Sequence, residues 1–181
     1  MKILGISGSI RDGSYNTAAL MAAKSLLPEH IHMDIHTLRE LPLYDDVLAT
    51  EDPPHPVNNF RNAIAAADAL LIASPEYNYS MTGVLKNALD WAATFTISNV
   101  LDQKTIAILG ASRTVFGTAR AQLHLRQVLH AANARVIRKP EVYIRRAQDA
   151  IGDDGILHDQ RTLEKIQSLL KALITDMMKD Q

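Results

Sequence analysis

Short apolar runs alternate with longer helical patterns along the whole chain, and this alternation restricts the fold more than any other feature. It is typical of βαβ units, in which each helix returns the chain to the same edge of a parallel sheet. We predict strands at residues 2–6, 32–38, 69–74, 105–110 and 135–137. We predict helices at residues 16–27, 57–67, 82–95, 118–132 and 160–178. These elements fit an α/β fold with a doubly wound, five-stranded parallel sheet of order 2-1-3-4-5 and helices on both faces.

The sequence shows no sign of a second domain. Its 181 residues suit one domain spanning residues 1–181, and residues 41–56 and 143–158 are expected to form surface loops. Along the second strand, polar and apolar residues alternate as on the exposed face of an edge strand; the polar ones are His30, His32, Asp34 and His36. This spacing is compatible with a metal ion, but exposure alone explains it, so we expect no metal site.

Composition excludes several function classes. Nineteen Lys and Arg against 20 Asp and Glu leave a net charge of −1, so we expect no nucleic-acid partner. The absence of Cys excludes disulfides, thiolate metal sites and cysteine-bound iron–sulfur clusters. The apolar run at the start is too short for a signal peptide, and no 18-residue apolar stretch predicts a membrane span. We therefore expect a cytoplasmic protein with no membrane partner.

Residues 7–17, between the first strand and the first helix, have the composition of an anion-binding loop. Gly8 and Gly13 allow tight turns, and the start of the helix offers unpaired N–H groups. Four side chains add hydrogen-bond donors or positive charge: Ser9, Arg11, Ser14 and Asn16. The alternative is an ordinary strand–turn–helix with a Ser or Asn cap.

The residues of this loop exclude several kinds of phosphate-containing ligand. Residues 7–17 contain no Lys, so the loop cannot be a nucleoside-triphosphate loop, and the Gly-x-Gly-x-x-Gly pattern of dinucleotide sites is missing. A phosphatase with a nucleophilic Cys is impossible in a chain without Cys. A terminal monophosphate, held beyond the end of the first strand, remains.

Two further loops are expected at the same edge of the sheet. Residues 74–80 follow the third strand and residues 110–113 follow the fourth, so both would border the crevice next to the first loop. Pro75 stiffens the second loop, and nearby N–H groups can address the carbonyls and nitrogens of a flat heteroaromatic ring. A turn with two locally packed Tyr side chains is the alternative for this loop.

Two motifs, taken together, carry a family resemblance. The first is Gly8-Ser9-Ile10-Arg11 with Ser14-Tyr15-Asn16. The second is Ser74-Pro75-Glu76-Tyr77-Asn78-Tyr79-Ser80 followed by Gly83-x-Leu85-Lys86-Asn87-Ala88-Leu89-Asp90-Trp91. Over about residues 3–165 the chain resembles the NADPH-dependent FMN reductase family, which includes quinone, chromate and azo-dye reductases.

The resemblance implies a flavodoxin-like fold, one non-covalent FMN per subunit, and a homodimer or homotetramer. It assigns the FMN phosphate to the first loop, at Ser9, Arg11, Ser14, Tyr15 and Asn16. It assigns the flavin ring to the second and third loops, at Pro75, Glu76, Tyr77, Asn78 and Ser112. The third loop departs from the family, which often has Gly-Gly-Ala-Arg there, and Arg113 and Phe116 are expected to narrow or recharge the pocket.

The implied activity is a two-electron transfer from NADPH or NADH, through FMN, to a small acceptor such as a quinone, chromate, an azo compound or free flavin. Donor and acceptor would use the same flavin face in turn, which is a ping-pong mechanism, and no catalytic side chain is expected. The alternatives are a flavodoxin-type electron carrier, which is usually strongly acidic, and a redox-linked interaction protein with little turnover.

Residues 82–95 predict a helix with an unusually broad apolar arc, from Val84 to Phe95 and including Trp91. A helix packed on one sheet needs a narrower stripe, so we predict a symmetric dimer through this helix, with Trp91 at the interface. Deep burial of the helix within its own subunit is the alternative.

Overall fold

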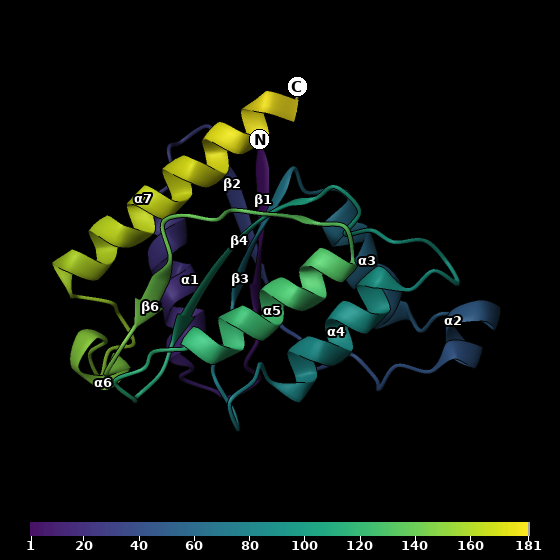
Figure 1. The fold of residues 1–181 in the computed structure, drawn as a ribbon, viewed down its shortest axis with the longest axis horizontal. Coiled ribbons are helices and arrows are strands. Elements are labelled where there is room, and N and C mark those ends of the chain that lie inside the picture. The colour runs from purple at the N-terminus through teal and green to yellow at the C-terminus, as the bar shows by residue number, and fades with distance from the viewer. Residues whose placement is uncertain (181) are drawn as a thin grey trace.

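A parallel sheet forms the centre of the computed structural model, which describes residues 1–180 (Figure 1). Its strands are β1 (Lys2–Ser7), β2 (His32–His36), β3 (Ala69–Ala73), β4 (Thr105–Ala111), β5 (Arg135–Val136) and β6 (Val142–Ile144). The order is β2-β1-β3-β4-β5, and β6 also pairs with β4. The predicted fold class and order of the first five strands are confirmed.

Helices cover both faces of this sheet. They are α1 (Tyr15–Ser25), α2 (Asp46–Glu51), α3 (His55–Ala65), α4 (Gly83–Ala93), α5 (Ala119–Ala131), α6 (Ala147–Ala150) and α7 (Gln160–Met177), followed by the 3-10 turn η1 (Met178–Asp180). Figure 1 shows α1 and α7 on one side and α3, α4 and α5 on the other. The five predicted helices agree with α1, α3, α4, α5 and α7 to within two residues at each end.

Side chains of each central strand point alternately to the two faces of the sheet, and they contribute to two separate hydrophobic cores. On β3, Leu71 packs with α1 and α7, while its neighbours Leu70 and Ile72 pack with α3, α4 and α5. Successive side chains point to opposite faces of a sheet, so a strand buried on both faces must be apolar at every position. All five residues of β3 are buried, which is why it reads as a continuous apolar run.

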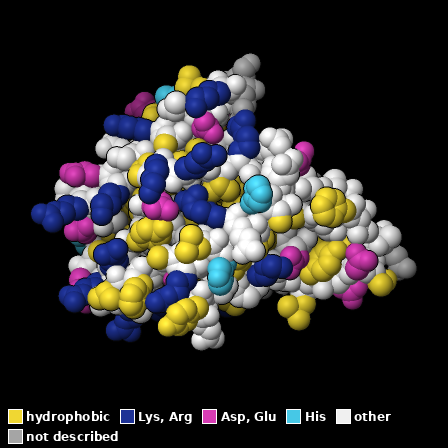
Figure 2. Space-filling model, in the orientation of Figure 1, with side chains coloured by type: hydrophobic (Ala, Val, Ile, Leu, Met, Phe, Trp, Pro, Cys, Tyr) yellow, Lys and Arg dark blue, Asp and Glu magenta, His cyan; other side chains and the backbone are white. Residues whose placement is uncertain are grey.

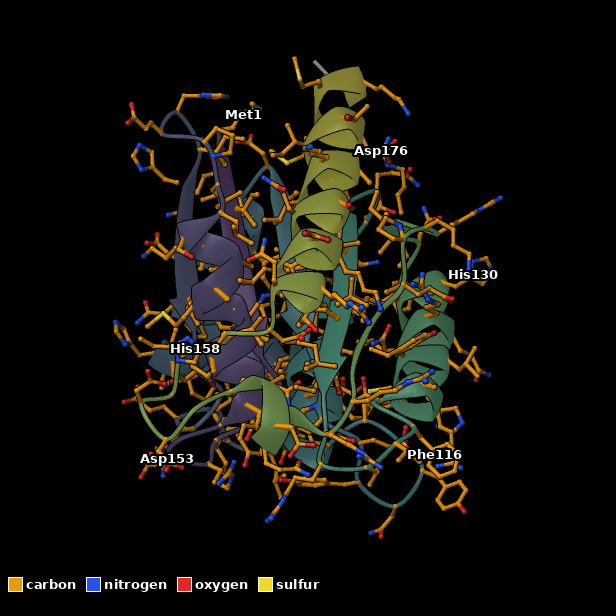
Figure 3. All side chains as sticks on the ribbon, turned by 90° about the vertical axis from the view of Figure 1, so that its left-hand side faces the viewer. Met1, Phe116, His130, Asp153, His158 and Asp176 are labelled. Atoms are coloured by element: carbon orange, nitrogen blue, oxygen red, sulfur yellow. The ribbon has the colours of Figure 1, made fainter. Side chains whose placement is uncertain are left out.

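The register places three connecting loops at one edge of the sheet. Ser7 pairs with Ala73, and Ala73 pairs with Leu109, so β1, β3 and β4 finish close together. Figure 3 shows Phe116 and Asp153 at this end of the molecule, with Met1 and Asp176 at the opposite end. The sheet thus brings the three predicted site loops to one place.

The sheet has a sixth strand, β6, that the sequence did not predict, while the strand predicted at residues 135–137 is found as β5. β5 pairs with Thr105 and Ile106 at the start of β4, whereas β6 pairs with residues 109–111 at its end. Between them lies Pro140, which has no N–H to donate to β4. The sheet described over residues 1–180 therefore has six strands, and residues 143–158, predicted as a loop, contain part of β6 and all of α6.

A second predicted loop, residues 41–56, contains helix α2 and the start of α3. Asp45 is the N-cap of α2, because its Oδ1 accepts hydrogen bonds from the N–H groups of Val47 (2.8 Å) and Leu48 (3.4 Å). The acidic pair Asp45-Asp46 therefore starts a helix within the stretch that the sequence predicted as a loop.

The prediction that Trp91 lies at a dimer surface is wrong. Trp91 is fully buried within its own subunit, in a cluster with Ala49 and Val57. Its ring meets that of Tyr44 edge-on, with centroids 4.9 Å apart, and its Nε1 donates to the carbonyl of Pro42 at 2.9 Å. The broad apolar arc of α4 packs on the sheet with one side and against α2 and the segment before it with the other, so no second subunit is needed to explain it (Figure 1).

The edge strand β2 has the exposed polar row that its sequence predicts. His32 and Asp34 are exposed, and Asp34 forms an ion pair with Lys2 at 3.0 Å. The lysine lowers the pKa of the Asp34 carboxyl, through a hydrogen bond and its charge. Among the side chains that the structure describes, no three His, Asp or Glu gather as metal ligands would, and no helix in the described part of the chain is long and apolar enough to cross a membrane. The cytoplasmic location stays a prediction.

Candidate functional site

Gly8 anchors the first loop to the two neighbouring elements. Its N–H donates to the carbonyl of Ala73 at 2.8 Å, and its own carbonyl accepts from Thr82 Oγ1 at 2.6 Å. A Cβ on Gly8 would lie 3.0 Å from the Ala73 oxygen, so this close approach to β3 favours glycine. Thr82 is also the N-cap of α4, which links the first loop to the helix that follows the second.

The same loop presents unpaired N–H groups at the start of α1. Ser14 caps the helix, because its Oγ accepts from the N–H groups of Asn16 (3.2 Å) and Thr17 (3.4 Å). Within residues 1–180, the N–H groups of residues 12–15 donate to no protein acceptor. Gly13, at φ 65°, turns the chain so that these donors come just before and within the first helical turn. An open N-terminus of this kind suits a phosphate monoester.

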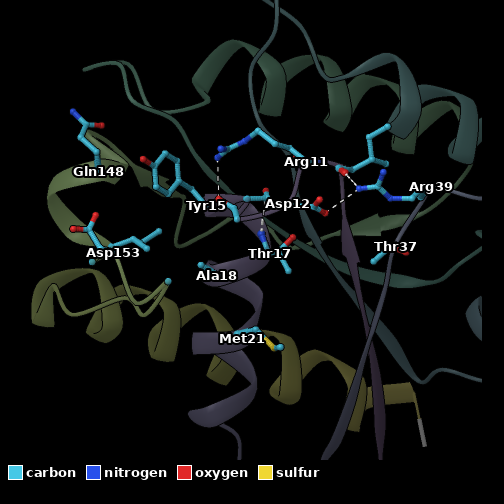
Figure 4. Close-up of a pocket in the computed structure, with 17 residues that line it drawn as sticks. Arg11, Asp12, Tyr15, Thr17, Ala18, Met21, Thr37, Arg39, Gln148 and Asp153 are labelled. Atoms are coloured by element: carbon cyan, nitrogen blue, oxygen red, sulfur yellow. Dashed lines mark hydrogen bonds and ion pairs between the residues drawn. The ribbon is translucent and has the colours of Figure 1, made fainter.

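Two arginines flank this loop, and Figure 4 shows both. The exposed Arg11 donates from Nη2 to the carbonyl of Gly13 at 2.9 Å. Arg39, from the segment after β2, donates from Nη2 to the carbonyl of Ile10 and to Asp12 Oδ1, the latter at 3.0 Å. Arg39 therefore braces the loop from outside, and its distance in sequence left no local signal for this role.

Asn16 points inward rather than toward a ligand. Its Nδ2 donates to the carbonyl of Ala111 at 3.0 Å, while its Oδ1 accepts from the N–H of Ala111 at 2.9 Å. The residue is 3% exposed. Because both polar atoms of the side chain are engaged, we assign Asn16 to positioning the first loop against β4.

The second loop ends in a tight turn. The N–H and carbonyl groups of Tyr77 and Ser80 bond reciprocally at 2.9 and 3.0 Å. Asn78 (φ 48°) and Tyr79 (φ 68°) occupy the two central positions in the left-handed region, as a type I′ turn requires. Pro75 is buried, while Tyr77 and Asn78 are exposed at the tip.

Glu76 joins the second loop to the third. Its Oε2 accepts from the N–H groups of Arg120 (3.0 Å) and Ala121 (3.3 Å), and its Oε1 accepts from Arg120 Nη1 at 2.9 Å. The carboxylate thus caps the start of α5 from outside the helix. The Arg120 guanidinium lies 4.0 Å from the ring centroid of Tyr79 and 4.5 Å from that of Phe116. Phe116 therefore packs on Arg120, a contact that sequence reasoning missed.

Gly110 permits the close packing at the base of the third loop. A Cβ there would lie 2.0 Å from Thr118 Oγ1 and 2.4 Å from the carbonyl of Ser74. Beyond it, the Oγ of Ser112 lies 2.9 Å from Thr114 Oγ1, and the N–H of Ser112 donates to the carbonyl of Ile144 at 3.0 Å. β6 thus fixes the position of Ser112.

The three loops enclose a cavity of about 420 Å³. Nine of the ten predicted site residues line it, and only Asn78 does not. The lining is Ser9, Arg11, Ser14, Tyr15, Asn16, Pro75, Glu76, Tyr77, Ala111, Ser112, Arg113 and Thr114. A larger cavity of about 630 Å³ lies on the outer side of the first loop, against residues 148–155 (Figure 4). The smaller one contains the predicted ring contacts and is the candidate cofactor site.

FMN fits this donor set. Its phosphate requires free N–H donors and positive charge, which residues 12–15 and Arg11 provide. Its flat ring requires an adjoining cavity with backbone polar groups, which the second and third loops border. The roles of the individual site residues stay predictions.

Comparison with known proteins agrees with this reading. The family model for NADPH-dependent FMN reductase matches residues 1–149. An NAD(P)H-dependent FMN reductase of Pseudomonas aeruginosa is 51% identical over 174 residues, which are 96% of this chain and 93% of the relative. An NAD(P)H:quinone oxidoreductase of Solanum tuberosum is 39% identical over 96% of this chain and 91% of its own length.

A solved structure agrees closely as well. The flavoenzyme NAD(P)H:(acceptor) oxidoreductase of Paracoccus denitrificans superposes with a TM-score of 0.89 at 30% sequence identity, covering 98% of this chain and 97% of the other. The sequence, the sheet topology and the loop geometry all lead to the same family. The chain therefore belongs to the NADPH-dependent FMN reductase family, and it is an NAD(P)H-dependent enzyme with FMN as its cofactor.

Proposed function

We propose that this enzyme passes two electrons from NAD(P)H to quinones and similar small acceptors by a ping-pong mechanism. The observation that carries the proposal is the 420 Å³ cavity that joins the anion loop to the second and third loops. A donor and an acceptor that each reach a flavin ring held in this cavity would use the same place, one after the other. When bound there, FMN supplies the hydride-transfer chemistry.

The residues of the chain bind and orient rather than react. The N–H groups of residues 12–15 and the Arg11 guanidinium hold the phosphate, and Ser112 and the backbone at Pro75 border the ring. The Glu76 carboxylate is already neutralised by Arg120, so it does not oppose a negative charge that develops nearby. No side chain in the cavity is assigned an acid or base role.

The acceptor range is part of the proposal. A quinone is flat and uncharged, so it fits an opening bordered by the exposed ring of Tyr77. The quinone oxidoreductase named above supports this acceptor class by similarity. Chromate, azo compounds and free flavin are further candidates, and Arg113 at the cavity favours the anionic ones.

Steady-state kinetics with NADPH and a benzoquinone test the mechanism. We expect oxidised-flavin absorbance in the purified protein and parallel double-reciprocal lines when both substrates are varied. Intersecting lines over a wide concentration range would instead show a ternary complex and overturn the ping-pong step. Rapid mixing with NADPH alone separates the enzyme from an electron carrier, because a carrier is reduced slowly without its own reductase.

We also propose that the enzyme is a homodimer or homotetramer. Five large apolar side chains near the end of α4 and around α2 are exposed, namely Leu43, Val47, Leu48, Phe95 and Ile97. Phe95 is 88% exposed, which is unusual for a Phe on a monomer surface. Light scattering of the unaltered enzyme and of Phe95→Glu tests this: a monomer in both cases would overturn the proposal. A single domain over residues 1–181 is likewise a proposal, and Gln181 lies outside the described residues.

A further inference from the structure

Positive charge is concentrated in one part of the sequence. Residues 113–146 contain eight Lys or Arg and a single acidic residue, although the whole chain has a net charge of −1. The eight are Arg113, Arg120, Arg126, Arg135, Arg138, Lys139, Arg145 and Arg146. Figure 2 shows many of the Lys and Arg side chains on the part of the face formed by α5, β6, α6 and α7.

Three of these residues lie beside the cofactor cavity, and we name Arg113, Arg145 and Arg146 the rim arginines. Arg113 lines the cavity. Arg145 and Arg146 directly follow β6, and the N–H of Arg146 donates to the carbonyl of Thr114 at 3.2 Å. The end of β6 and the third loop are therefore adjacent, which places the backbone of the rim arginines at one side of the cavity.

The rim arginines have no protein partner for their charge. All three side chains are exposed, and no side chain that the structure describes gives them a carboxylate or a side-chain hydrogen bond. By contrast, Arg120 pairs with Glu76 and Lys139 pairs with Glu141, each at 2.9 Å. Unpaired like charges on adjacent segments repel one another, and an anion bound between them would remove that repulsion.

The backbone at Arg146 supports a role in binding. Arg146 has φ 43° and ψ 53°, in the left-handed region where Gly or Asn is less strained. Strained residues persist where the surrounding structure holds them, and they are frequent at ligand sites. An arginine occupies this position although a glycine would suit the backbone better.

We infer that the rim arginines bind the 2′-phosphate of NADPH and so set the preference for NADPH over NADH. This inference rests on the proposed function, because it concerns the electron donor of the same site. NADPH and NADH differ only in that phosphate, whereas a benzoquinone carries no charge for the arginines to bind. A dianionic phosphate is the group that several guanidinium forks bind best.

The phosphate of FMN is a less suitable partner for the rim arginines. That phosphate has its own donors in residues 12–15, together with Arg11. Arg145 and Arg146 are not part of the cavity lining, so they remain exposed to a second ligand that enters from outside. The two phosphate groups thus have separate binding residues.

The test compares both donors in the FMN-loaded double variant Arg145→Ala/Arg146→Gly, with the same benzoquinone as acceptor. We expect kcat/KM for NADPH to fall about tenfold and kcat/KM for NADH to change less than about twofold. Arg138→Ala is the matched control, because Arg138 is also exposed but lines a separate pocket together with His130. Figure 3 shows His130 far from Phe116, which lies at the end of the molecule that holds the three loops. The control should leave the ratio of the two donors unchanged.

Binding provides a readout that does not depend on turnover. Calorimetric titration with adenosine 2′,5′-bisphosphate should show binding to the unaltered enzyme that weakens about tenfold in the double variant, whereas binding of adenosine 5′-monophosphate should be unaffected. The midpoint temperature of thermal unfolding should not be lower in Arg146→Gly than in the unaltered enzyme, because glycine suits the left-handed backbone.

Three outcomes would overturn the inference. One is an equal loss for NADPH and NADH, the second is an equal loss in Arg138→Ala, and the third is release of FMN from the double variant. Failure of the proposed function would look different, since the unaltered enzyme would then reduce no quinone with either donor.

Discussion

Asn16 and Ala111 are 95 positions apart in sequence, yet the Asn16 side chain forms hydrogen bonds with both backbone groups of Ala111. The pair joins the start of α1, which follows β1, to the end of β4. The anion loop and the third loop therefore keep a fixed separation, which sets the width of the cavity between them.

Replacing Asn16 by Ala should loosen this connection. The N–H and carbonyl of Ala111 would lose their partners while buried, at a cost of about 2–3 kcal/mol in the free energy of unfolding. Urea unfolding of the apoprotein measures this loss, and an FMN titration should show weaker binding. Ser25→Ala, an exposed change at the end of the same helix, is the control, and equal stability of the two variants would contradict the assignment.

Arg11→Ala tests the phosphate site. Loss of the guanidinium should weaken FMN binding by about 1.5–3 kcal/mol, the range of a charge-assisted hydrogen bond. Riboflavin lacks the phosphate, so it should bind the unaltered protein and the variant weakly and almost equally. Fluorescence titration with both flavins measures the difference. If riboflavin binding fell as much as FMN binding, Arg11 would not act on the phosphate.

Two glycines form a matched pair for a test of packing. Gly110→Ala forces a Cβ against Thr118 and the Ser74 carbonyl, and it should cost at least about 3 kcal/mol of stability. Gly83→Ala meets nothing within 4 Å at the start of α4, so it should be neutral or stabilise the fold by up to about 0.5 kcal/mol. Thermal and urea unfolding of both variants give the comparison; similar stabilities would show that β4 can shift to make room.

His36 should make stability depend on pH. Burial lowers the pKa of its imidazole below the ordinary value of 6.5, although Glu40 partly opposes this. The unfolded chain therefore binds the proton more readily, and stability is complete above about pH 6.5 and falls as the pH drops through the lower pKa of the folded state. His36→Gln should flatten the curve of unfolding free energy between about pH 7.5 and 5.5. An unchanged curve would show that groups other than His36 determine how stability depends on pH in this range.

The sequence predicted the elements whose burial leaves a local pattern. β3 is apolar throughout because helices cover both of its faces, and α7 is amphipathic because one side is exposed. β6 was missed because it is only three residues long and pairs with a single neighbour. α2 was missed because Asp45 suits a turn and a helix cap equally well.

The site was predictable to a similar extent. The side chains that line the cavity come directly after the ends of β1, β3 and β4. Once the strand order of a parallel sheet is known, it determines which of these loops lie next to one another. The connections that hold the loops, namely Asn16–Ala111, Glu76–Arg120 and Arg39–Ile10, join residues 29–95 positions apart. The place of Trp91 is a further example, because a helical pattern reports how wide an apolar arc is but not which element covers it.

The Glu76 carboxylate, bonded to the first N–H groups of α5, has a consequence for cofactor affinity. This bond and the Asn16 bonds lie within the polypeptide, so the entropy of ordering the loops is lost when the chain folds rather than when a ligand arrives. FMN binding at these loops then requires little further ordering of the chain, so more of the contact free energy remains as affinity for the flavin.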